Sequence, residues 1–308
     1  MTAAITVRGL CKRYGSVRAV DGVSFDVSTG EIFGILGPNG SGKTTTLECL
    51  QGLRHRDGGD ITVLGLDPLR ETEQLRRRIG SQLQESALPE HLRVGEALRL
   101  FAAATPGARA WEDLMQEWGL AEKRDASFAS LSGGQRQRLF VALALVSDPE
   151  VVFLDEMTTG LDPEARHVAW DLVERIRGRG TTVVLVTHFM DEAERLCDRI
   201  GVLVRGRLVD IDTPAGVVAR HGGSVRASFT SGDADLAWLS RVDHVASVAR
   251  RDGRIHVDGD AHMITHLGSA LLQHDLDPTD LRVVQPSLED AYLRLVRSDE
   301  EAGHARAG

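Results

Sequence analysis

A glycine-rich segment near the N-terminus combines residue types that bind the phosphates of a nucleotide. It fits the pattern G-x-x-x-x-G-K-[ST] at every fixed position. An apolar run of strand length precedes it and residues 45–53 have a helical pattern, so the motif lies in the strand–loop–helix context that it requires. The predicted phosphate-binding residues are Gly37, Pro38, Asn39, Gly40, Ser41, Gly42, Lys43, Thr44 and Thr45.

The chemistry of this loop follows from its residues. Backbone N–H groups of residues 40–45 are predicted to wrap the phosphates, whose negative charge the dipole of the following helix favours. Lys43 is one of three lysines among 36 basic residues, and its compact ammonium group fits between the β- and γ-phosphates where a planar guanidinium is too bulky. Thr44 supplies a hydroxyl ligand for Mg²⁺. The loop therefore predicts a nucleoside triphosphate with Mg²⁺.

Two adjacent carboxylates, Asp155 and Glu156, follow the apolar run 151–154. Such a run is typical of a strand buried on both faces, so the acids emerge at its carboxyl end, where ligands bind in open α/β sheets. We expect Asp155 to hold Mg²⁺ through water. We expect Glu156 to polarise the attacking water as a general base.

Residues 131–135 read Leu-Ser-Gly-Gly-Gln. With the phosphate loop and the paired acids, this motif makes the chain resemble the ATP-binding-cassette (ABC) ATPases over about residues 5–215, in six ordered motifs. The resemblance implies that this signature closes over ATP held by the phosphate loop of another subunit, and that Asp162 lies in a loop crossing the dimer interface. The signature residues expected to approach the nucleotide are Ser132, Gly133, Gly134 and Gln135.

The resemblance implies roles for three further residues. Tyr14 matches the aromatic residue that stacks on adenine, with a place in the core as the alternative. His188 matches the histidine that contacts the γ-phosphate and helps to arrange attack. Gln84 matches the glutamine that senses Mg²⁺ and water and couples nucleotide state to the membrane partner, and Gln82 is its rival for that role. Met157 stands where proline is frequent in the family, which changes the stiffness of the loop but removes no functional atom.

Composition sets the broad class of the protein. The 308 residues, 42% hydrophobic and 26% charged, suit a globular chain with one large domain and a smaller one. A net charge of −9 argues against a nucleic-acid partner. The three cysteines lack paired spacing, which indicates a reducing compartment without a metal cluster. With no signal peptide and no run of about 20 apolar residues, we expect a soluble protein.

The fold class that these patterns predict is α/β, with a P-loop ABC ATPase core in residues 1–219. We expect a β-rich N-terminal part, a parallel core sheet and a helical subdomain at about 89–145. Residues 219–223 have the composition of a linker. Beyond them, an accessory domain over 220–297 has a βαββαβ pattern that suggests a ferredoxin-like fold. Residues 298–308 are predicted to form a disordered tail.

The elements expected in this accessory domain begin with strand 224–230. They continue with helix 234–241, strand 244–250, strand 254–258, helix 262–274 and strand 281–285. A last helix, Ser287–Arg297, starts with a Ser-x-x-Asp capping box.

The resemblance implies an ATP-hydrolysing transporter subunit, acting as a homodimer or with a paired nucleotide-binding subunit. Its partners are separate transmembrane permease subunits, which place it in the cytoplasm on the inner face of the cell membrane. Residues 286–293 resemble the C-terminal signature of ATP-binding subunits in ABC-2 exporters, including drug-resistance pumps, which favours export. One alternative is a soluble ABC protein acting on ribosomes or DNA, although such proteins usually carry two cassettes, long insertions or zinc-binding cysteines. The other is a regulatory subunit, expected to lack Glu156, His188 or Lys43.

Overall fold

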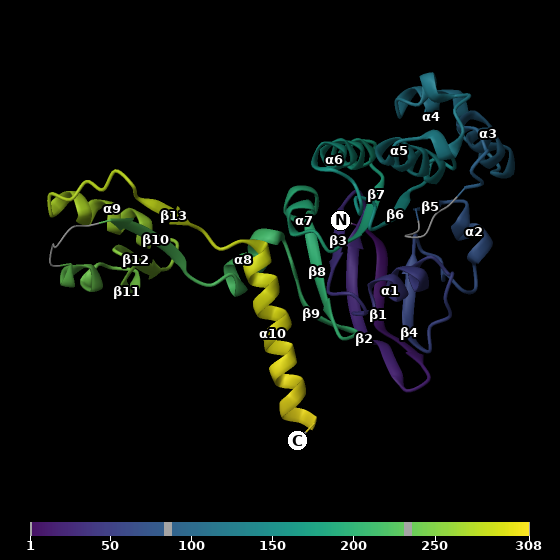
Figure 1. Ribbon diagram of the computed structural model, residues 1–308. Helices are drawn as coiled ribbons and strands as arrows, with labels where there is room; N and C mark the ends of the chain where they lie inside the picture. Colours follow the sequence, from purple (N-terminus) through teal and green to yellow (C-terminus); the bar gives the residue numbers. More distant parts are fainter. Residues whose placement is uncertain (1, 83–87, 231–235, 308) are drawn as a thin grey trace. The chain divides into compact units, whose positions relative to one another are not determined.

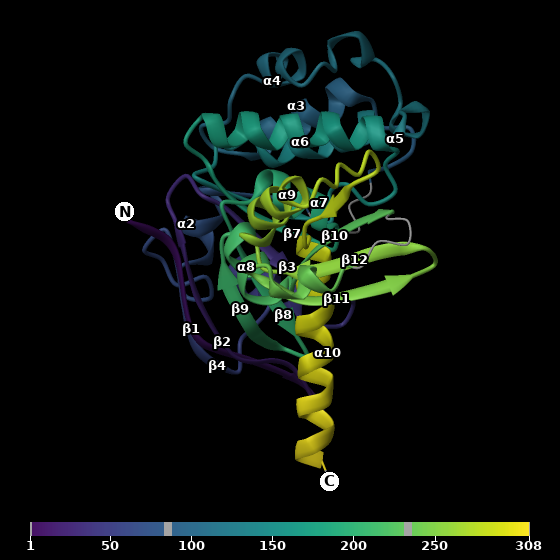
Figure 2. The same ribbon diagram turned by 90° about the vertical axis from the view of Figure 1, so that its left-hand side faces the viewer.

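The computed structural model describes residues 2–82, 88–230 and 236–307, with side chains described as far as Asp299. The chain divides into two compact units, Met1–Pro214 and Ala215–Gly308. Each unit is described by itself below. Figure 1 shows the elements of both units, and Figure 2 shows them after a quarter turn.

A three-stranded antiparallel sheet forms the β-rich N-terminal part of the first unit. Its strands are β1 (Ala3–Tyr14), β2 (Val17–Ser28) and β4 (Gly58–Val63), in the order β2-β1-β4. In β1, alternate side chains such as Ile5 and Val7 are fully buried, as the period of a half-buried strand requires. The β-rich part that the sequence predicts is therefore present.

The core sheet of this unit has six strands in the order β5-β6-β7-β3-β8-β9. All neighbouring pairs are parallel except β8 and β9, which form the terminal antiparallel hairpin. Every residue of β3, β6 and β7 is buried, because both faces of the sheet are covered. One face packs with buried residues of the antiparallel sheet, where the ring of Phe25 stacks on that of Phe33 with centroids 5.1 Å apart. The strands are β3 (Ile32–Leu36), β5 (Ile79–Gln82), β6 (Val151–Asp155), β7 (Thr182–Thr187), β8 (Arg199–Val204) and β9 (Arg207–Asp212).

Seven α-helices of the described chain belong to this first unit. In both views α5 and α6 lie side by side, and α3 and α4 lie beyond them, away from the β1–β2–β4 sheet (Figures 1 and 2). Within the described residues no helix is long and apolar enough to cross a membrane. The helices are α1 (Lys43–Leu50), α2 (Thr72–Arg76), α3 (Val94–Ala104), α4 (Trp111–Glu117), α5 (Gly133–Ala144), α6 (Pro163–Gly178) and α7 (Met190–Leu196), with short 3₁₀ turns η1 (Ala121–Lys123) and η2 (Phe128–Ser130).

The second unit is built on a four-stranded antiparallel sheet in the order β11-β12-β10-β13. Because β12 separates β10 from β11 and is antiparallel to both, the sheet has the split βαβ arrangement of ferredoxin-like folds. Its core includes the buried side chains Phe229, Val257 and Leu267. The elements are β10 (Val225–Thr230), η3 (Ala237–Arg241), β11 (Val245–Arg251), β12 (Arg254–Gly259), α9 (Met263–Gln273) and β13 (Arg282–Val284).

The second unit differs from the sequence expectations in three places. The predicted linker at 219–223 is largely helical, because α8 spans Pro214–His221 and begins with a proline, which is favourable in a first helical turn. The predicted helix 234–241 is, in its described part, the 3₁₀ turn η3. The tail predicted to be disordered continues α10 (Leu288–Ala307), since its alanine, glutamate and arginine residues favour helix and no proline interrupts them.

Candidate nucleotide site

The phosphate loop connects β3 to α1 and is shaped by glycines that no other residue can replace. Gly42 has φ of 100°, and a Cβ there would lie 2.2 Å from the carbonyl oxygen of Ala19. A Cβ on Gly37 would lie 2.2 Å from the carbonyl oxygen of Leu203. The neighbouring strands therefore pack directly against the loop backbone, which holds its N–H groups in place.

Lys43 begins α1 and lies buried within this loop. Its Nζ donates hydrogen bonds to the carbonyl oxygens of Gly37, at 2.8 Å, and Pro38, at 3.1 Å. Burial lowers the pKa of Lys43, and the nearby carboxylates of Glu156 and Asp155 oppose that shift. The ammonium group is thus a preorganised cation surrounded by the backbone that would carry the phosphates.

A cavity of about 560 Å³ opens in front of this loop. It brings together residues from the loop, from the segment after β6 and from the segment after β7, which are far apart in the sequence. The residues that line it are Ala19, Asn39, Gly40, Gly42, Lys43, Thr44, Thr45, Glu156, Thr159 and His188. Of these, Ala19 and Thr159 were not predicted as site residues: Ala19 belongs to β2, and Thr159 lies between Glu156 and Asp162.

Asp155 is the last residue of β6 and is only 2% exposed. Burial, together with the charge of Glu156, raises the pKa of Asp155 to about 6, against opposing effects of a hydrogen bond from Thr44 and the charge of Lys43. Among the described residues its Oδ1 has no hydrogen-bond partner. A buried carboxylate oxygen without a partner, beside a threonine hydroxyl, fits the oxygen ligands that Mg²⁺ prefers.

No group of three His, Cys, Asp or Glu side chains in the described ranges is arranged to hold a metal ion by itself.

Glu156 and His188 follow neighbouring parallel strands, so both leave the sheet at the same edge. Glu156 has φ of 49°, uncommon for a residue with a side chain, and its backbone N–H donates to the carbonyl oxygen of Val186 at 2.9 Å. The Nδ1 of His188 lies 3.3 Å from Oε1 of Glu156. The ring of His188 also packs against that of Phe189, with centroids 4.2 Å apart. The fold therefore aims this carboxylate and imidazole into the cavity together.

The signature motif lies at the start of α5. Ser132 is the N-cap, accepting a hydrogen bond from the backbone of Gln135 at 3.3 Å, while its own N–H donates to the Gln135 side chain at 3.0 Å. Asp162 caps α6 in the same way, accepting from the backbone of Ala165 at 2.8 Å. A hollow of about 320 Å³ between the two helix starts is lined by Ser132, Gly133, Gly134, Arg138, Gly160, Leu161, Asp162, Glu164, Ala165 and Val168.

This signature hollow and the phosphate-loop cavity share no residue. One chain thus carries the phosphate loop and the signature as separate surfaces. Each surface has a helix N-terminus whose N–H groups favour negative charge.

Two predicted residues lie elsewhere or cannot be placed. Tyr14, at the end of β1, is 42% exposed and does not line the cavity; Lys12 and Arg54 lie over its ring at 5.7 and 5.4 Å. Gln84 lies outside the described residues. Its rival Gln82 is buried at the end of β5 and accepts a hydrogen bond from the side chain of Gln137 in α5 at 2.9 Å.

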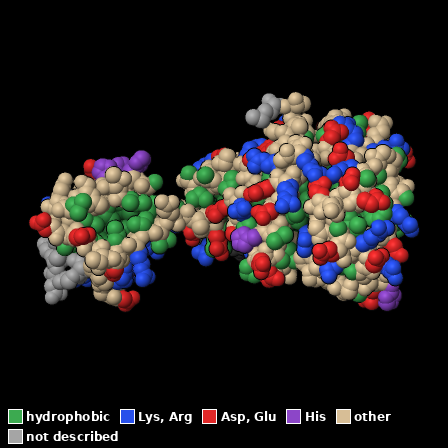
Figure 3. Space-filling model, turned by 90° about the horizontal axis from the view of Figure 1, so that it is seen from above, with side chains coloured by type: hydrophobic (Ala, Val, Ile, Leu, Met, Phe, Trp, Pro, Cys, Tyr) green, Lys and Arg blue, Asp and Glu red, His purple; other side chains and the backbone are tan. Residues whose placement is uncertain are grey.

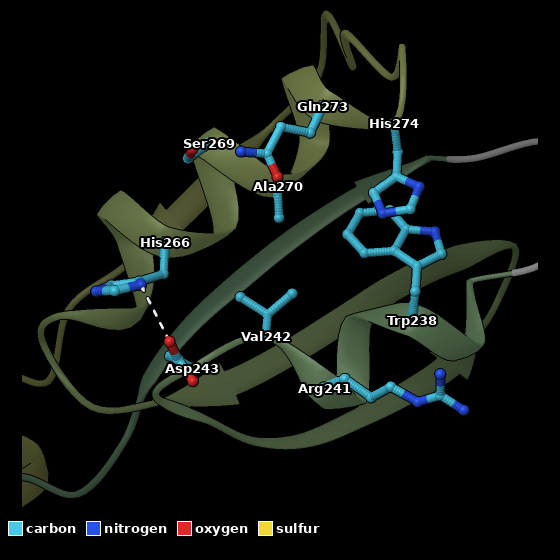
Figure 4. A pocket seen from close by; sticks show the side chains of 9 residues that line it. All are labelled: Trp238, Arg241, Val242, Asp243, His266, Ser269, Ala270, Gln273 and His274. Carbon is cyan, nitrogen blue, oxygen red and sulfur yellow. Dashed lines mark ion pairs between the residues drawn. The ribbon is translucent and has the colours of Figure 1, made fainter.

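The second unit has a hollow of its own, of about 510 Å³, between η3 and α9 (Figure 4). The indole of Trp238 stacks on the ring of His274 at one end, with centroids 3.9 Å apart. At the other end His266 and Asp243 lie 3.9 Å apart. None of the sequence-predicted site residues lines this hollow.

On the face that Figure 3 displays, acidic and basic side chains intermingle over the first unit without a large basic patch, whereas hydrophobic side chains gather on the second unit. Three histidines of the second unit lie close together, since the ring of His244 lies 4.8 and 5.3 Å from those of His266 and His262.

A glycine loop before a helix, a strand ending in two carboxylates and a separate capped signature helix define a P-loop ATPase of the ATP-binding-cassette class. The chain belongs to the ABC transporter family, whose pattern matches residues 20–159. It is an ABC ATPase that binds nucleotide.

Particular relatives are similar over longer stretches. The daunorubicin resistance ATP-binding protein DrrA3 of Streptomyces coeruleorubidus is 37% identical over 313 residues, covering 98% of each chain. The Nod factor export ATP-binding protein I of Burkholderia orbicola (strain AU 1054) is 44% identical over 226 residues, covering 72% of this chain and 74% of that protein. A solved dimeric ATP-binding cassette in a post-hydrolysis state, bound to ADP and phosphate, is 25% identical with a TM-score of 0.60, covering 68% of this chain and 98% of that one.

Proposed function

We propose that this protein is the ATP-hydrolysing subunit of an exporter that moves a drug, lipid or other small molecule through separate membrane subunits. The observation that supports export is the match to DrrA3, named for daunorubicin resistance, which covers 98% of both chains and so includes the second unit. The similarity to a Nod factor export protein points in the same direction.

Three residues would hold Mg²⁺ with the nucleotide: Thr44 through its hydroxyl, Asp155 through water and Gln84. Bound Mg²⁺ neutralises charge that develops on the β- and γ-phosphates. Lys43 and the backbone N–H groups of the loop bind the same phosphates and orient them for attack in line. Tyr14 stacks on the adenine of ATP.

Glu156 accepts the proton of the attacking water as general base, and His188 contacts the γ-phosphate and helps to arrange attack. Their separation of 3.3 Å supports this pairing, because one side chain holds the other in orientation. Asp155 takes no part in that proton transfer, and its role would be to hold Mg²⁺ through water.

Two subunits would complete the site. Because the phosphate loop and the signature form separate surfaces on one chain, we propose a homodimer, or a pair with another nucleotide-binding subunit, in which Ser132, Gly133, Gly134 and Gln135 of one chain cover ATP on the other. Asp162 lies beside them at the interface. The solved dimeric cassette with ADP and phosphate supports this arrangement. The dimer would lie on the cytoplasmic side of the membrane, bound to its permease subunits.

The test is reconstitution with a membrane subunit encoded beside this chain's gene, in vesicles that enclose no ATP. Export predicts ATP-dependent movement of a lipophilic dye away from the side where this protein binds, lost in Glu156→Gln. Dye movement toward that side overturns the direction. Two further outcomes would contradict transport: co-sedimentation with ribosomes or DNA without a membrane partner, or no ATP turnover by an assembled complex.

A further inference from the structure

Glu192, in the first turn of α7, has a buried carboxyl group that the proposed mechanism does not use. Its exposed fraction is 0%, and α7 follows directly after His188. Carboxylates are rarely buried unless other groups satisfy them. The side chains around the Glu192 carboxyl group therefore indicate which elements of the fold it connects.

The first neighbour is Trp170, which belongs to α6. Its Nε1–H donates to Oε1 of Glu192 at 3.1 Å in a fully buried contact. An indole has one N–H and no acceptor, so this hydrogen bond uses all of its polar capacity. It ties α7 to the helix that Asp162 caps at the dimer-facing signature hollow.

The other neighbours are two threonine hydroxyls from the segments that carry the predicted catalytic pair. Thr187 comes directly before His188, and Thr158 lies two residues after Glu156. Burial raises the pKa of Glu192, and the nearby hydroxyls of Thr187 and Thr158 and the indole N–H of Trp170 oppose that shift.

The contact with Thr158 is incomplete. Among the described residues, Oε2 of Glu192 and Oγ1 of Thr158 are buried and neither makes a hydrogen bond of normal length and angle. Among the described residues, the hydrogen bond from Trp170 is therefore the contact that anchors this carboxyl group.

A second, more exposed contact joins the same two helices near His188. The guanidinium of Arg166, on α6, lies 4.1 Å from the ring centroid of Phe189 and 3.4 Å from the carboxylate of Asp191. Since the ring of Phe189 packs on His188, this contact connects α6 to the imidazole.

We propose that Glu192 is a positioning residue for hydrolysis, whose carboxyl group fixes α7 against α6 and so holds His188, which precedes α7, beside Glu156. The inference rests on the proposed function of those two residues. A shift of about 1 Å in a reacting group can lower turnover by about 10²-fold, so such a tether acts on kcat rather than on ATP affinity.

The test compares Glu192→Ala, Glu192→Gln and Trp170→Phe with the wild type in the assembled transporter. The matched control is Glu194→Ala, which removes an exposed glutamate of the same helix. ATP turnover gives kcat and KM, a fluorescent nucleotide gives affinity, and thermal melting reports folding. Glu156→Gln is measured alongside.

We expect Glu192→Ala to lower kcat by about tenfold or more with ATP affinity within about twofold. Glu192→Gln keeps an acceptor for Trp170 and gains a donor for Thr158, so kcat should return to within about threefold of the wild type. Trp170→Phe keeps the ring but removes the N–H, and should lower kcat by about threefold to tenfold without changing affinity.

Normal kcat in Trp170→Phe overturns the proposal, even where Glu192→Ala fails to fold. So does a loss of kcat in Glu194→Ala equal to that in Glu192→Ala. These results leave the proposed function intact as long as Glu156→Gln is inactive. An active Glu156→Gln contradicts the proposed function instead.

Discussion

The Nδ1 of His188 lies 3.3 Å from Oε1 of Glu156, although 31 residues separate them in the sequence. The pairing of β6 with β7 produces this proximity, since residues that follow neighbouring parallel strands emerge at one edge of the sheet. The fold of the chain therefore holds a carboxylate and an imidazole together in the lining of the phosphate-loop cavity.

Replacing Glu156 with Gln should lower ATP hydrolysis by about 10²–10⁴-fold, because the amide keeps the shape of the side chain but cannot accept the proton. ATP binding should persist, and ATP-bound dimers should accumulate in gel filtration. Glu73→Gln, at an exposed position of α2, is the control and should hydrolyse ATP normally. A Glu156→Gln protein with near-normal turnover would contradict the assignment of the base.

Damage to the two separate surfaces should have different effects on ATP binding. Lys43→Ala should abolish tight binding by the monomer. Ser132→Arg should leave it intact and block dimer closure. Ser132→Ala controls for the lost helix cap, which costs about 1 kcal/mol of stability without adding bulk. Equal loss of monomer binding in Lys43→Ala and Ser132→Arg would contradict the two-subunit site.

Mixing Lys43→Ala with Ser132→Arg should restore part of the activity. In the mixed dimer, the intact loop of one chain faces the intact signature of the other, which makes one complete site. The measurement is ATP turnover as a function of mixing ratio, with a maximum expected near equal amounts.

Glu192→Gln should have a pH-dependent effect on melting temperature. The raised pKa of Glu192 means that its protonated form is favoured in the folded state, so the associated stability is present below the unfolded-state pKa and is lost as pH rises through the folded-state pKa. The neutral amide avoids this loss. The variant should therefore melt above the wild type at pH 8, with the difference shrinking toward pH 5. A difference that grows toward acid pH would contradict the direction of the shift.

Truncation after His221, the end of α8, should remove all of the second unit that follows α8. ATP affinity should not change. The residues that line the phosphate-loop cavity all lie in the first unit. Assembly with the membrane subunit should weaken. Co-purification of truncated and full-length chains with that subunit measures this effect, and unchanged assembly would argue against the role given to the second unit.

The sequence predicts best where neighbouring residues carry the whole signal. The phosphate loop, the apolar run before Asp155 and the capping box at Ser287 are each contained in a few consecutive positions, and each lies where expected. The strand β5 was not predicted, because Gly80, Ser81 and Gln82 interrupt its apolar character while its burial comes from β6 and α5.

Contacts between elements that are far apart in the sequence could not be predicted from local patterns. Glu192 forms no spacing pattern with Trp170, Thr158 or Thr187, since three different elements bring these residues together. Tyr14 was predicted from its sequence motif, but its ring is exposed and does not line the cavity. Its stacking role stays a prediction.

The scarcity of lysine has a practical consequence for labelling. Lys43 is enclosed by the phosphate loop, and Lys12 is paired with Asp57 at 2.9 Å with a side chain only 13% exposed. Lys123, in η1 of the helical region, is exposed. Among the lysines, an amine-reactive fluorophore should therefore attach mainly at Lys123. Among its side-chain amines, the protein thus offers one readily accessible position for spectroscopic reporters, in η1 close to α4.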